Sequence, residues 1–347
     1  DPAVVAARRA WWYKKARPKT SISPRFGISY PITDRGILHF SYGHFLQFPS
    51  FSDLYQRPEF KVTTASGTQG VFGNADLNAQ KTIMYEFGLQ QQISDDISFD
   101  ITGFYRDTRD WTSTSAPIPV IDPTGETATV FYTQFINKDY ANSRGITISV
   151  VKRPTSLLSF NLSYTFQTAE GVNSDKQADQ ARYATNDRGT VVSGVVLAPL
   201  DWDQRHTANL SIGLSREDWG VFLIAQYGSG LPYTPVLNQV ESRGNDAYRP
   251  TNTRRLPPNY NVDLRAFKSF RLDPVNLSLF VKVFNLFDRR NEIRVYGETG
   301  RARATPAALG ISALSGAYRL NTLEEYLLRP DFFSEPRQIQ FGVEINL

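Results

Sequence analysis

Three histidines, His39, His44 and His206, are the side chains in this sequence whose ordinary chemistry best suits proton transfer or metal binding. A metal site would need second and third ligands at close spacing, and none of the three histidines has them. Cysteine does not occur in the sequence, which excludes disulfides, thiolate metal sites and cysteine nucleophiles. The residues therefore predict no metal site and no bound cofactor.

The segment DWDQRH places Asp203 three residues before His206, an arrangement that a hydrolase could combine with a distant serine. A hydrogen-bond cluster at the start of a strand explains the same residues, and we favour that interpretation. Gly228 and Gly230 in YGSGLPY do not form a phosphate-binding loop, because neither Lys-Ser/Thr nor a helix follows them. No catalytic residue is predicted, and we expect that the protein is not an enzyme.

The elements that must carry any site are strands, because apolar and polar residues alternate strictly along the chain. In the last segment, RQIQFGVEINL, the apolar Ile339, Phe341 and Val343 are separated by Gln340 and Gly342. Similar alternation occurs at residues 83–92, 158–167, 207–214 and 260–267. Less regular strands are predicted at 25–33, 37–48, 97–111, 130–151, 220–233 and 275–287. The sequence thus predicts about eleven strands.

Composition limits where such strands could lie. The mean hydropathy is only −0.36, yet 13% of the 347 residues are aromatic. No run approaches the roughly 18 consecutive apolar residues of a membrane-spanning helix. The net charge of +4 is mild, and no dense block of Lys and Arg suggests nucleic acid as a partner.

The connections alternate between short turns and long loops. TDRG, SDD, KRPTS, REDWG and LDP are tight turns, whereas the long loops cover residues 50–81, 113–127, 171–201, 236–259 and 291–336. This segregation is typical of an antiparallel transmembrane β-barrel with periplasmic turns and extracellular loops, rather than of a soluble β-sandwich. Tyr and Phe near strand ends are then expected to anchor the barrel at the headgroup level of an outer membrane. In this orientation the C-terminus lies on the periplasmic side.

An odd number of antiparallel strands, entered from a loop, cannot close as an ordinary bacterial barrel. Residues 1–22 are therefore interpreted as the remainder of a preceding extracellular loop with a short helix at 3–15, and residues 23–347 as the C-terminal half of a larger barrel. Alone, these residues are expected to form an open, curled sheet with Ile339, Phe341 and Val343 on its convex face.

Several motifs resemble those of TonB-dependent outer-membrane receptors. They are SPRFGISYPITDRGILHFSYGHFLQFPSFSDLY (Ser23–Tyr55), GNADLNAQKTIMYEFGLQ (Gly73–Gln90), NSRGITISV, FNLFD and FSEPRQIQFGVEINL. PLDWDQRHTANLS and PPNYNVDLRAFKSFRL resemble the subgroup with a carboxypeptidase-regulatory-like N-terminal domain. Ala75 and Gln80 depart from the usual Pro and Glu, and Leu347 stands where the family usually ends in an aromatic residue.

The resemblance implies a barrel of about 22 strands with a plugged lumen, of which this chain supplies the C-terminal eleven. It implies energised uptake of a scarce, bulky nutrient such as a siderophore, cobalamin or glycan, across the outer membrane of a Gram-negative cell. The implied partners are outer-membrane lipid and lipopolysaccharide, a plug domain, the TonB energy-coupling complex and a small-molecule or oligosaccharide ligand. The plug domain and the coupling segment do not occur within these residues. A passive porin-like channel and an outer-membrane hydrolase are the alternatives.

Two groups of residues are candidates for contacts in such a receptor. The polar positions of alternating strands should face the lumen, where they would hold the plug or line a permeation path. They are Glu86, Gln90, Gln92, Asn161, Gln167, Asp263, Arg265 and Glu344. The loop aromatics that could contact an extracellular ligand are Phe51, Tyr55 and Tyr248.

Overall fold

The computed structural model describes residues 2–3, 6, 18–56, 67–119, 130–155, 157–179, 197–236, 251–303 and 329–346. Most of the helix expected at 3–15 lies outside the described residues, and so does Tyr248. No helix within the described part of the chain is long and apolar enough to cross a membrane.

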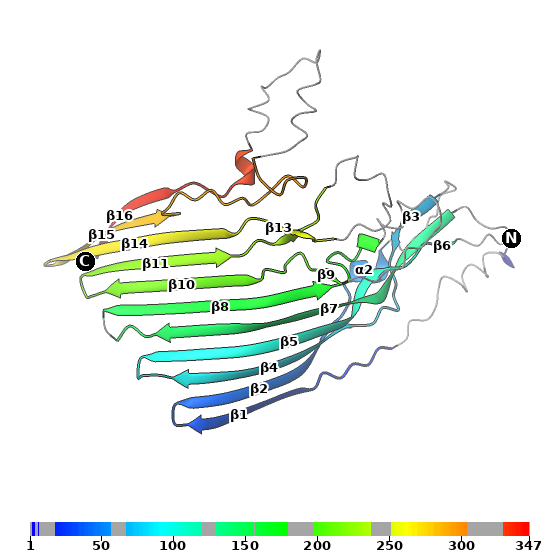
Figure 1. The fold of residues 1–347 in the computed structure, drawn as a ribbon, viewed down its shortest axis with the longest axis horizontal. Helices are drawn as coiled ribbons and strands as arrows, with labels where there is room; N and C mark the ends of the chain where they lie inside the picture. Colours follow the sequence, from blue (N-terminus) through cyan, green and yellow to red (C-terminus); the bar gives the residue numbers. More distant parts are fainter. Residues whose placement is uncertain are drawn as a thin grey trace, which may run out of the picture.

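The described residues form one large antiparallel sheet whose main path contains eleven strands (Figure 1). In sheet order they are β1 (Arg25–Thr33), β2 (Gly36–Gln47), β4 (Gln80–Gln92), β5 (Ile97–Thr114), β7 (Val130–Lys152), β8 (Leu158–Gly171), β10 (His206–Ser215), β11 (Trp219–Gly228), β14 (Asn259–Leu272), β15 (Val275–Phe284) and β16 (Gln338–Asn346). Consecutive strands along this path are neighbours, as expected for an up-and-down barrel wall. The predicted number of strands and their antiparallel order are confirmed.

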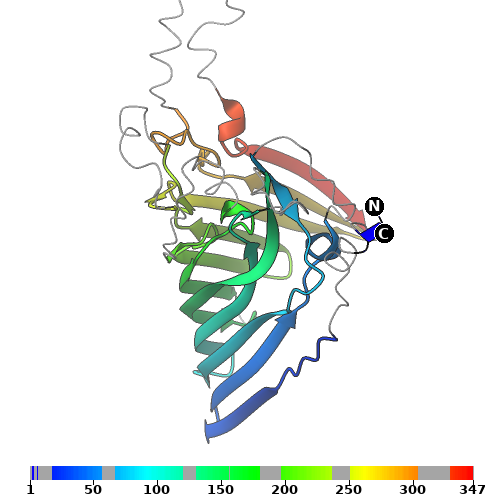
Figure 2. The same cartoon turned by 90° about the vertical axis from the view of Figure 1, so that its right-hand side faces the viewer.

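The sheet is curled but does not close on itself (Figure 2). It ends at β1 on one side and at β16 on the other, and these two strands do not pair with each other. The predicted open part of a barrel is therefore confirmed.

Short elements lie within the long loops at one end of the sheet. β3 (Gly67–Phe72) runs parallel to β7, and β6 (Ile118–Pro119) and β9 (Ala198–Pro199) pair with β7 and β8. β12 (Pro232–Tyr233) and β13 (Arg254–Arg255) form a separate pair, and the helical turns are α2 (Phe51–Tyr55) and η2 (Pro330–Phe332). The sequence did not predict these as separate strands, because two to six residues are too few to show alternation, and β12 lies at the end of the single strand predicted over 220–233.

The register separates the residues of the sheet into an apolar face and a polar face. Directly opposite residues share a face, so the pairings can be followed from β1 to β16. The apolar face carries Ile28, Phe40, Phe87, Ile101, Ile148, Leu162, Leu210, Leu223, Leu264, Val281 and Phe341. The polar face carries Ser29, Ser41, Glu86, Thr102, Thr147, Ser163, Asn209, Gln226, Asp263, Ser278 and Glu344. Phe341 is 82% exposed, so the apolar face has no protein cover within the described residues.

An aromatic row borders the apolar face toward the long loops. Phe26, Tyr42, Tyr85 and Tyr105 occupy directly opposite positions on β1, β2, β4 and β5. The ring centroids of Tyr42 and Tyr85 are 5.1 Å apart, and those of Tyr85 and Tyr105 are 6.4 Å apart. Such a row is typical of the aromatic girdle of a membrane barrel.

The strands continue beyond this row at the loop end. β7 has 23 residues, about twice the 9–11 that cross a bilayer. Its distal part packs against the loops, because Phe135 is buried with Val71 and Leu77 and contacts Leu54 near the end of α2. The buried apolar core of the described residues therefore lies at the loop end, where the ends of β7 and β8 pack against the loops.

Ion pairs connect the short turns at the opposite end. Lys152, at the end of β7, pairs with Asp96 of the preceding turn, and Arg35 pairs with Asp95 at 3.0 Å. Hydrogen bonds from Lys152, Ser94 and Thr155 hold the pKa of Asp96 well below its ordinary value. Adjacent turns are thereby tied together along this edge.

Candidate functional site

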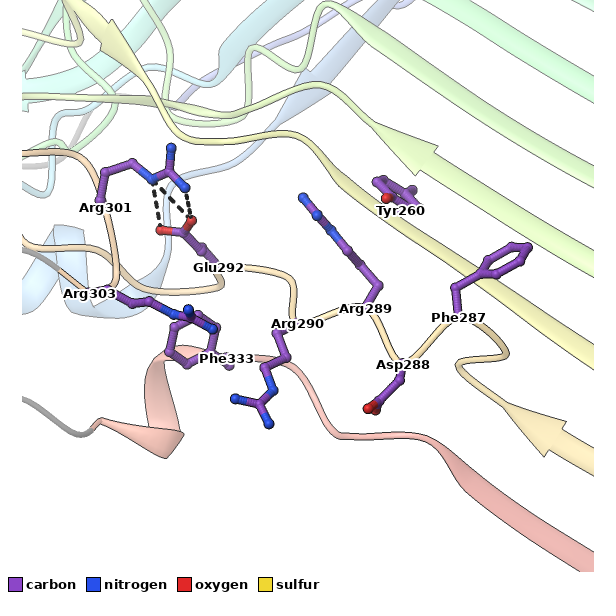
Figure 3. A pocket seen from close by; sticks show the side chains of 9 residues that line it. All are labelled: Tyr260, Phe287, Asp288, Arg289, Arg290, Glu292, Arg301, Arg303 and Phe333. Carbon is purple, nitrogen blue, oxygen red and sulfur yellow. Dashed lines mark hydrogen bonds and ion pairs between the residues drawn. The ribbon is translucent and has the colours of Figure 1, made fainter.

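An arginine pocket lies at the loop end of β14, β15 and β16 (Figure 3). Its cavity measures about 520 Å³. It is lined by Tyr260, Phe287, Asp288, Arg289, Arg290, Glu292, Arg301, Arg303 and Phe333. Most of these residues come from the segment that follows β15, and Phe333 precedes β16.

The motif FNLFD builds the turn that positions two of the arginines. Asn285 has φ = 53° and Asp288 has φ = 50°, in the left-handed region that Asn and Asp tolerate better than most residues. The Asn285 amide donates to the carbonyls of Arg289 and Glu335, at 2.9 and 3.0 Å, and its oxygen accepts from the Arg289 backbone N–H at 2.8 Å. The Arg337 backbone N–H donates to Asp288 at 2.9 Å. The turn therefore joins β15 to β16 and holds Arg289 at the pocket.

A second asparagine fixes the floor of the pocket. The Asn291 amide donates to the Tyr260 carbonyl at 2.8 Å, and its oxygen accepts from the Tyr260 backbone N–H at 3.1 Å. The Ser334 backbone N–H donates to the Asn291 carbonyl at 2.9 Å. Asn291 thus extends the hydrogen bonding of the sheet between β14 and β16, so the pocket is built on rigid strand ends.

The charges of the pocket are not balanced. Its lining has four guanidinium groups and two carboxylates, a net charge of +2. Arg301 is neutralised, because its Nε and Nη2 donate to Glu292 Oε1 at 3.1 and 2.6 Å (Figure 3). Arg289 stacks over Tyr260, 4.7 Å from the ring centroid, and Arg303 over Phe333 at 5.2 Å.

Within the described residues, Arg289, Arg290 and Arg303 form no ion pair with a carboxylate, and Arg289 Nε is buried without a hydrogen-bond partner. Guanidinium groups are planar donors that suit carboxylates, phosphates and similar oxyanions. The pocket is therefore suited to binding an anion that also offers a flat surface to its aromatic rings.

The eight predicted lumen-facing residues all lie on the polar face, as their register partners show. Glu86 is opposite Ser41, Asn161 is opposite Ser211, and Glu344 is opposite Ser278. They are distributed over β4, β8, β14 and β16 and do not gather into one site. Their contacts with a plug or a permeating ligand remain a prediction.

Phe51 and Tyr55 lie in α2, where their rings stack with centroids 6.3 Å apart. They are 81% and 55% exposed. Ser50 caps the helix, and an ion pair between Asp53 and Lys176 attaches it to the loop that follows β8. The two aromatic rings are therefore available for a ligand or plug, which also remains a prediction.

Asp203 and His206 do not contact each other as an acid–base pair. The carboxylate of Asp203, fully buried, accepts from the Ala169 backbone N–H at 2.7 Å and pairs with Arg205 at 2.9 Å and with Arg255. The His206 ring bonds to Tyr164 at 2.8 Å.

The other two histidines are also bound to hydroxyl groups. The His44 ring bonds to Tyr42 at 2.5 Å and the His39 ring to Thr102 at 3.3 Å. Within the described part of the chain, no hydrogen bond joins a histidine ring to a serine hydroxyl. The described residues also contain no group of three or more His, Cys, Asp or Glu side chains that could hold a metal ion.

The sequence prediction missed the arginine pocket. The only trace of the pocket in the sequence is two short clusters of basic residues: RRNE, directly after FNLFD, and RAR at 301–303. Short basic pairs in a long loop are common on protein surfaces, so they become informative only when the fold shows that β14 and β16 bring them together.

Comparison with known proteins decides the family. A family model described as "TonB dependent receptor-like, beta-barrel" matches residues 4–286. The chain belongs to the TonB-dependent receptor family. Its open sheet fits the C-terminal portion of the barrel of these outer-membrane receptors, as the motifs predicted.

Solved structures of TonB-dependent receptors share the fold. A mutant of the ferric enterobactin receptor of Pseudomonas aeruginosa is 17% identical, covers 93% of this chain and has a TM-score of 0.56, with 39% of the receptor covered. The outer membrane transporter YddB of Escherichia coli is 13% identical, with 78% of this chain and 38% of the transporter covered and a TM-score of 0.55. The ferric citrate transporter FecA is 13% identical, with 93% of this chain and 38% of the transporter covered and a TM-score of 0.52.

The chain thus spans well under half the length of these receptors. No sequence among curated proteins matches it. The family model and these solved structures are described as receptors and transporters.

Proposed function

We propose that this chain supplies about half of the wall of an outer-membrane receptor that takes up a scarce, bulky and anionic nutrient with energy from the TonB complex. The observation that carries the proposal is the arginine pocket, in which three guanidinium groups have no carboxylate partner among the described residues. Among the three nutrient classes expected, this charge favours a siderophore with carboxylate or catecholate groups over a neutral glycan. Two structural neighbours are named for ferric enterobactin and for ferric citrate.

The two faces of the sheet assign the remaining roles. The apolar face would lie against hydrocarbon, since each inner strand of the main path pairs with a neighbouring strand on both sides. The polar face would enclose a plug domain, with Glu86, Asp263 and Arg265 among its contacts. Long loops and the arginine pocket would face the extracellular medium, and the short turns and the end of β16 the periplasm.

The two free edges would pair with further strands of the barrel, because an unpaired edge in hydrocarbon costs several kcal/mol for each unpaired group. The same receptor would also include the plug domain, inside the barrel, and the segment that contacts TonB.

The test compares ligand binding by the full-length receptor with and without the pocket arginines. The variant carries Arg289→Gln, Arg290→Gln and Arg303→Gln. The control carries Arg35→Gln, Arg153→Gln and Arg216→Gln in three short turns, which removes the same number of charges far from the pocket. Binding of ferric citrate, ferric enterobactin, vitamin B12 and maltoheptaose is measured by fluorescence quenching at two salt concentrations.

We expect one of the iron chelates to bind the parent receptor, and the triple variant to lose at least thirtyfold in affinity, since hydrogen bonds to charged groups contribute about 1.5–3 kcal/mol each. Binding restricted to maltoheptaose, or equal binding of a chelate by the parent and the triple variant, would refute an anionic ligand in this pocket. Ion conductance of the receptor in a planar bilayer without any energy source would favour the passive channel instead.

A further inference from the structure

A buried group of polar side chains lies where the loop after β8 meets the distal parts of β5 and β7. Asp139 of β7 is 3% exposed, and Asp179 and Asn173 of the loop are 4% and 8% exposed. The Asn173 amide nitrogen donates to Asp139 Oδ2 at 3.0 Å and to Asp179 Oδ1 at 3.2 Å. Asp139 lies five residues toward the loops from Arg144, which is opposite Tyr105 of the aromatic row. Two carboxylates buried outside the membrane-spanning part are therefore joined by one neutral amide.

The two carboxylates differ in how their charge is compensated. Lys138 Nζ donates to Asp179 Oδ2 at 2.9 Å, and the Ser113 hydroxyl of β5 donates to the same oxygen at 3.4 Å. Among the described residues, Asp139 forms no ion pair, and its Oδ1 is buried without a hydrogen-bond partner.

The surroundings of Asp139 favour its protonated form. Burial raises the pKa of Asp139 above the ordinary 3.8, and the negative charge of Asp179 raises it further. The groups that lower this pKa are Asn173 of the loop, Ser113 of β5 and Lys138 of its own strand, and burial outweighs them. A proton on Asp139 removes a buried charge that has no cation paired with it.

The same loop holds the helical turn α2 at the loop end of the sheet (Figure 1). Lys176 of the loop forms an ion pair with Asp53, which is buried in α2, and its ammonium lies 5.3 Å from the centroid of the Phe135 ring. α2 also packs through Leu54 against the apolar cluster around Phe135. Since Lys176 precedes Asp179 by three residues, a displacement of Asp179 is passed to α2 through a short stretch of chain.

We propose that Asp139 is a proton-binding site that controls how firmly α2 is held. With Asp139 protonated, Asn173 joins the two acidic side chains and the loop stays in place. When Asp139 loses its proton, its charge and that of Asp179 repel each other, and the loop loosens together with its ion pair to α2.

The direction of the pH dependence follows from the raised pKa. Because the pKa of Asp139 is higher in the closed form than in the open form, acid favours the closed form, and the closed form is lost as pH rises through its pKa. The exposed aromatic rings of α2 move with this change. The inference goes beyond the proposed function and does not depend on which nutrient is bound.

Hydrogen exchange of the purified full-length receptor in detergent, followed by mass spectrometry without nutrient, tests the switch. The backbone N–H groups of Leu54, Gln56, Gly73 and Asn74 are hydrogen bonded in and beside α2, so they exchange when this segment opens. Their protection is expressed relative to the exchange of an unstructured peptide at each pH, between about pH 4 and about pH 8, which removes the ordinary pH dependence of exchange.

Three variants accompany the parent. Asp139→Asn is close in shape and uncharged at every pH. Asp175→Asn is the matched control, because Asp175 is an exposed carboxylate of the same loop. Lys176→Gln removes the ion pair to Asp53 and shows how much of the protection passes through it.

In the parent, the protection of these amides should fall at least tenfold between about pH 4 and about pH 8, since each unit of raised pKa changes the opening equilibrium by about tenfold. Asp139→Asn should keep the high protection of the parent in acid throughout this range, and Asp175→Asn should follow the parent. Lys176→Gln should reduce protection at every pH. Any titration of Asp53 itself is common to the parent and Asp139→Asn, so the difference between them reports Asp139.

A parent whose protection does not change with pH would overturn the proposal, and this measurement needs no variant. A pH profile that persists in Asp139→Asn, or one that disappears equally in Asp175→Asn, would also overturn it. Millimolar calcium that restores protection near pH 8 in the parent but not in Asp139→Asn would show a metal site at the two carboxylates and would overturn the assignment to a proton. Nutrient uptake is measured separately, so a failure of the proposed transport function leaves the exchange result readable.

Discussion

Leu162 and Ser163 on β8 offer a direct test of which face lies against lipid. Leu162 is opposite Val150 and Leu210 on the apolar face, and Ser163 is opposite Ser149 and Asn209 on the polar face. The apolar residues of β8 alternate from Leu158 to Phe166, eight steps along the strand, which corresponds to about 26 Å of length and about 20 Å of height at a tilt near 40°. Leu162 is the midpoint, so it should lie close to the centre of the bilayer.

An arginine at the lipid-facing midplane of a barrel costs about 2–4 kcal/mol, whereas lumen positions tolerate it. Leu162→Arg in the full-length receptor should therefore lower the free energy of unfolding by about 2–4 kcal/mol, and Ser163→Arg by less than about 1 kcal/mol. Urea titration of the receptor refolded into lipid vesicles, followed by tryptophan fluorescence, measures both. Equal losses for the two variants, or a larger loss for Ser163→Arg, would refute the assignment of faces.

Three further predictions concern the turns and the loop end. Because the pKa of Asp96 is lowered in the folded state, its stabilising contribution is complete above the ordinary pKa of 3.8 and is lost as pH falls through the lower folded pKa. Asp96→Asn should therefore reduce stability at pH 7. When unfolding midpoints are measured against pH, the variant should also show a smaller loss of stability below pH 4 than the parent. Asp203→Ala should lower the free energy of unfolding by about 3 kcal/mol, because it leaves Arg255 and Arg205 without their buried partner, and a loss below about 1 kcal/mol would contradict this. Asn285→Gly should keep the left-handed turn, whereas Asn285→Ala should strain it by about 1–2 kcal/mol. The free energy of unfolding should therefore be highest in the parent, lower in the glycine variant and lowest in the alanine variant. Both variants lose the hydrogen bonds of the Asn285 amide and should bind ligand more weakly.

The strands of the wall could be predicted from sequence because a barrel wall obeys a local rule. Each residue meets either hydrocarbon or a polar interior, so alternation is nearly complete in segments such as 158–167, and the tight turns fix the register between neighbours. The ends of two strands were less accurate: β5 continues to Thr114, three residues beyond its predicted end, and β11 ends at Gly228 although a strand was predicted over 220–233. A bulge at Asp110, with φ = 57°, also interrupts the pairing of β5 with β7.

The arginine pocket could not be predicted, because its parts meet only through long-range pairing. Tyr260 precedes Arg289 by 29 positions, and Phe333 follows Arg289 by 44. Asn285 and Asn291 hold these segments together with side-chain amides, which no pattern of hydrophobicity reveals. The residues of the polar face were easier to name, but alternation assigns a face and not a ligand.

Local strain and unsatisfied polar groups are concentrated at one end of the described sheet. The non-glycine residues with positive φ are Asp110, Asn252, Asn285 and Asp288, and all lie at the loop end. So do the buried polar atoms without hydrogen-bond partners, on Asp139, Asn142, Thr168, Asn259, Arg289 and Tyr296. The short-turn end is instead tied by ion pairs such as those of Asp96 and Asp95. Strain of this kind persists where surrounding structure holds it, and it clusters at sites of binding. The distribution agrees with a wall that is fixed at its short turns and with the proposed ligand site at its loop end.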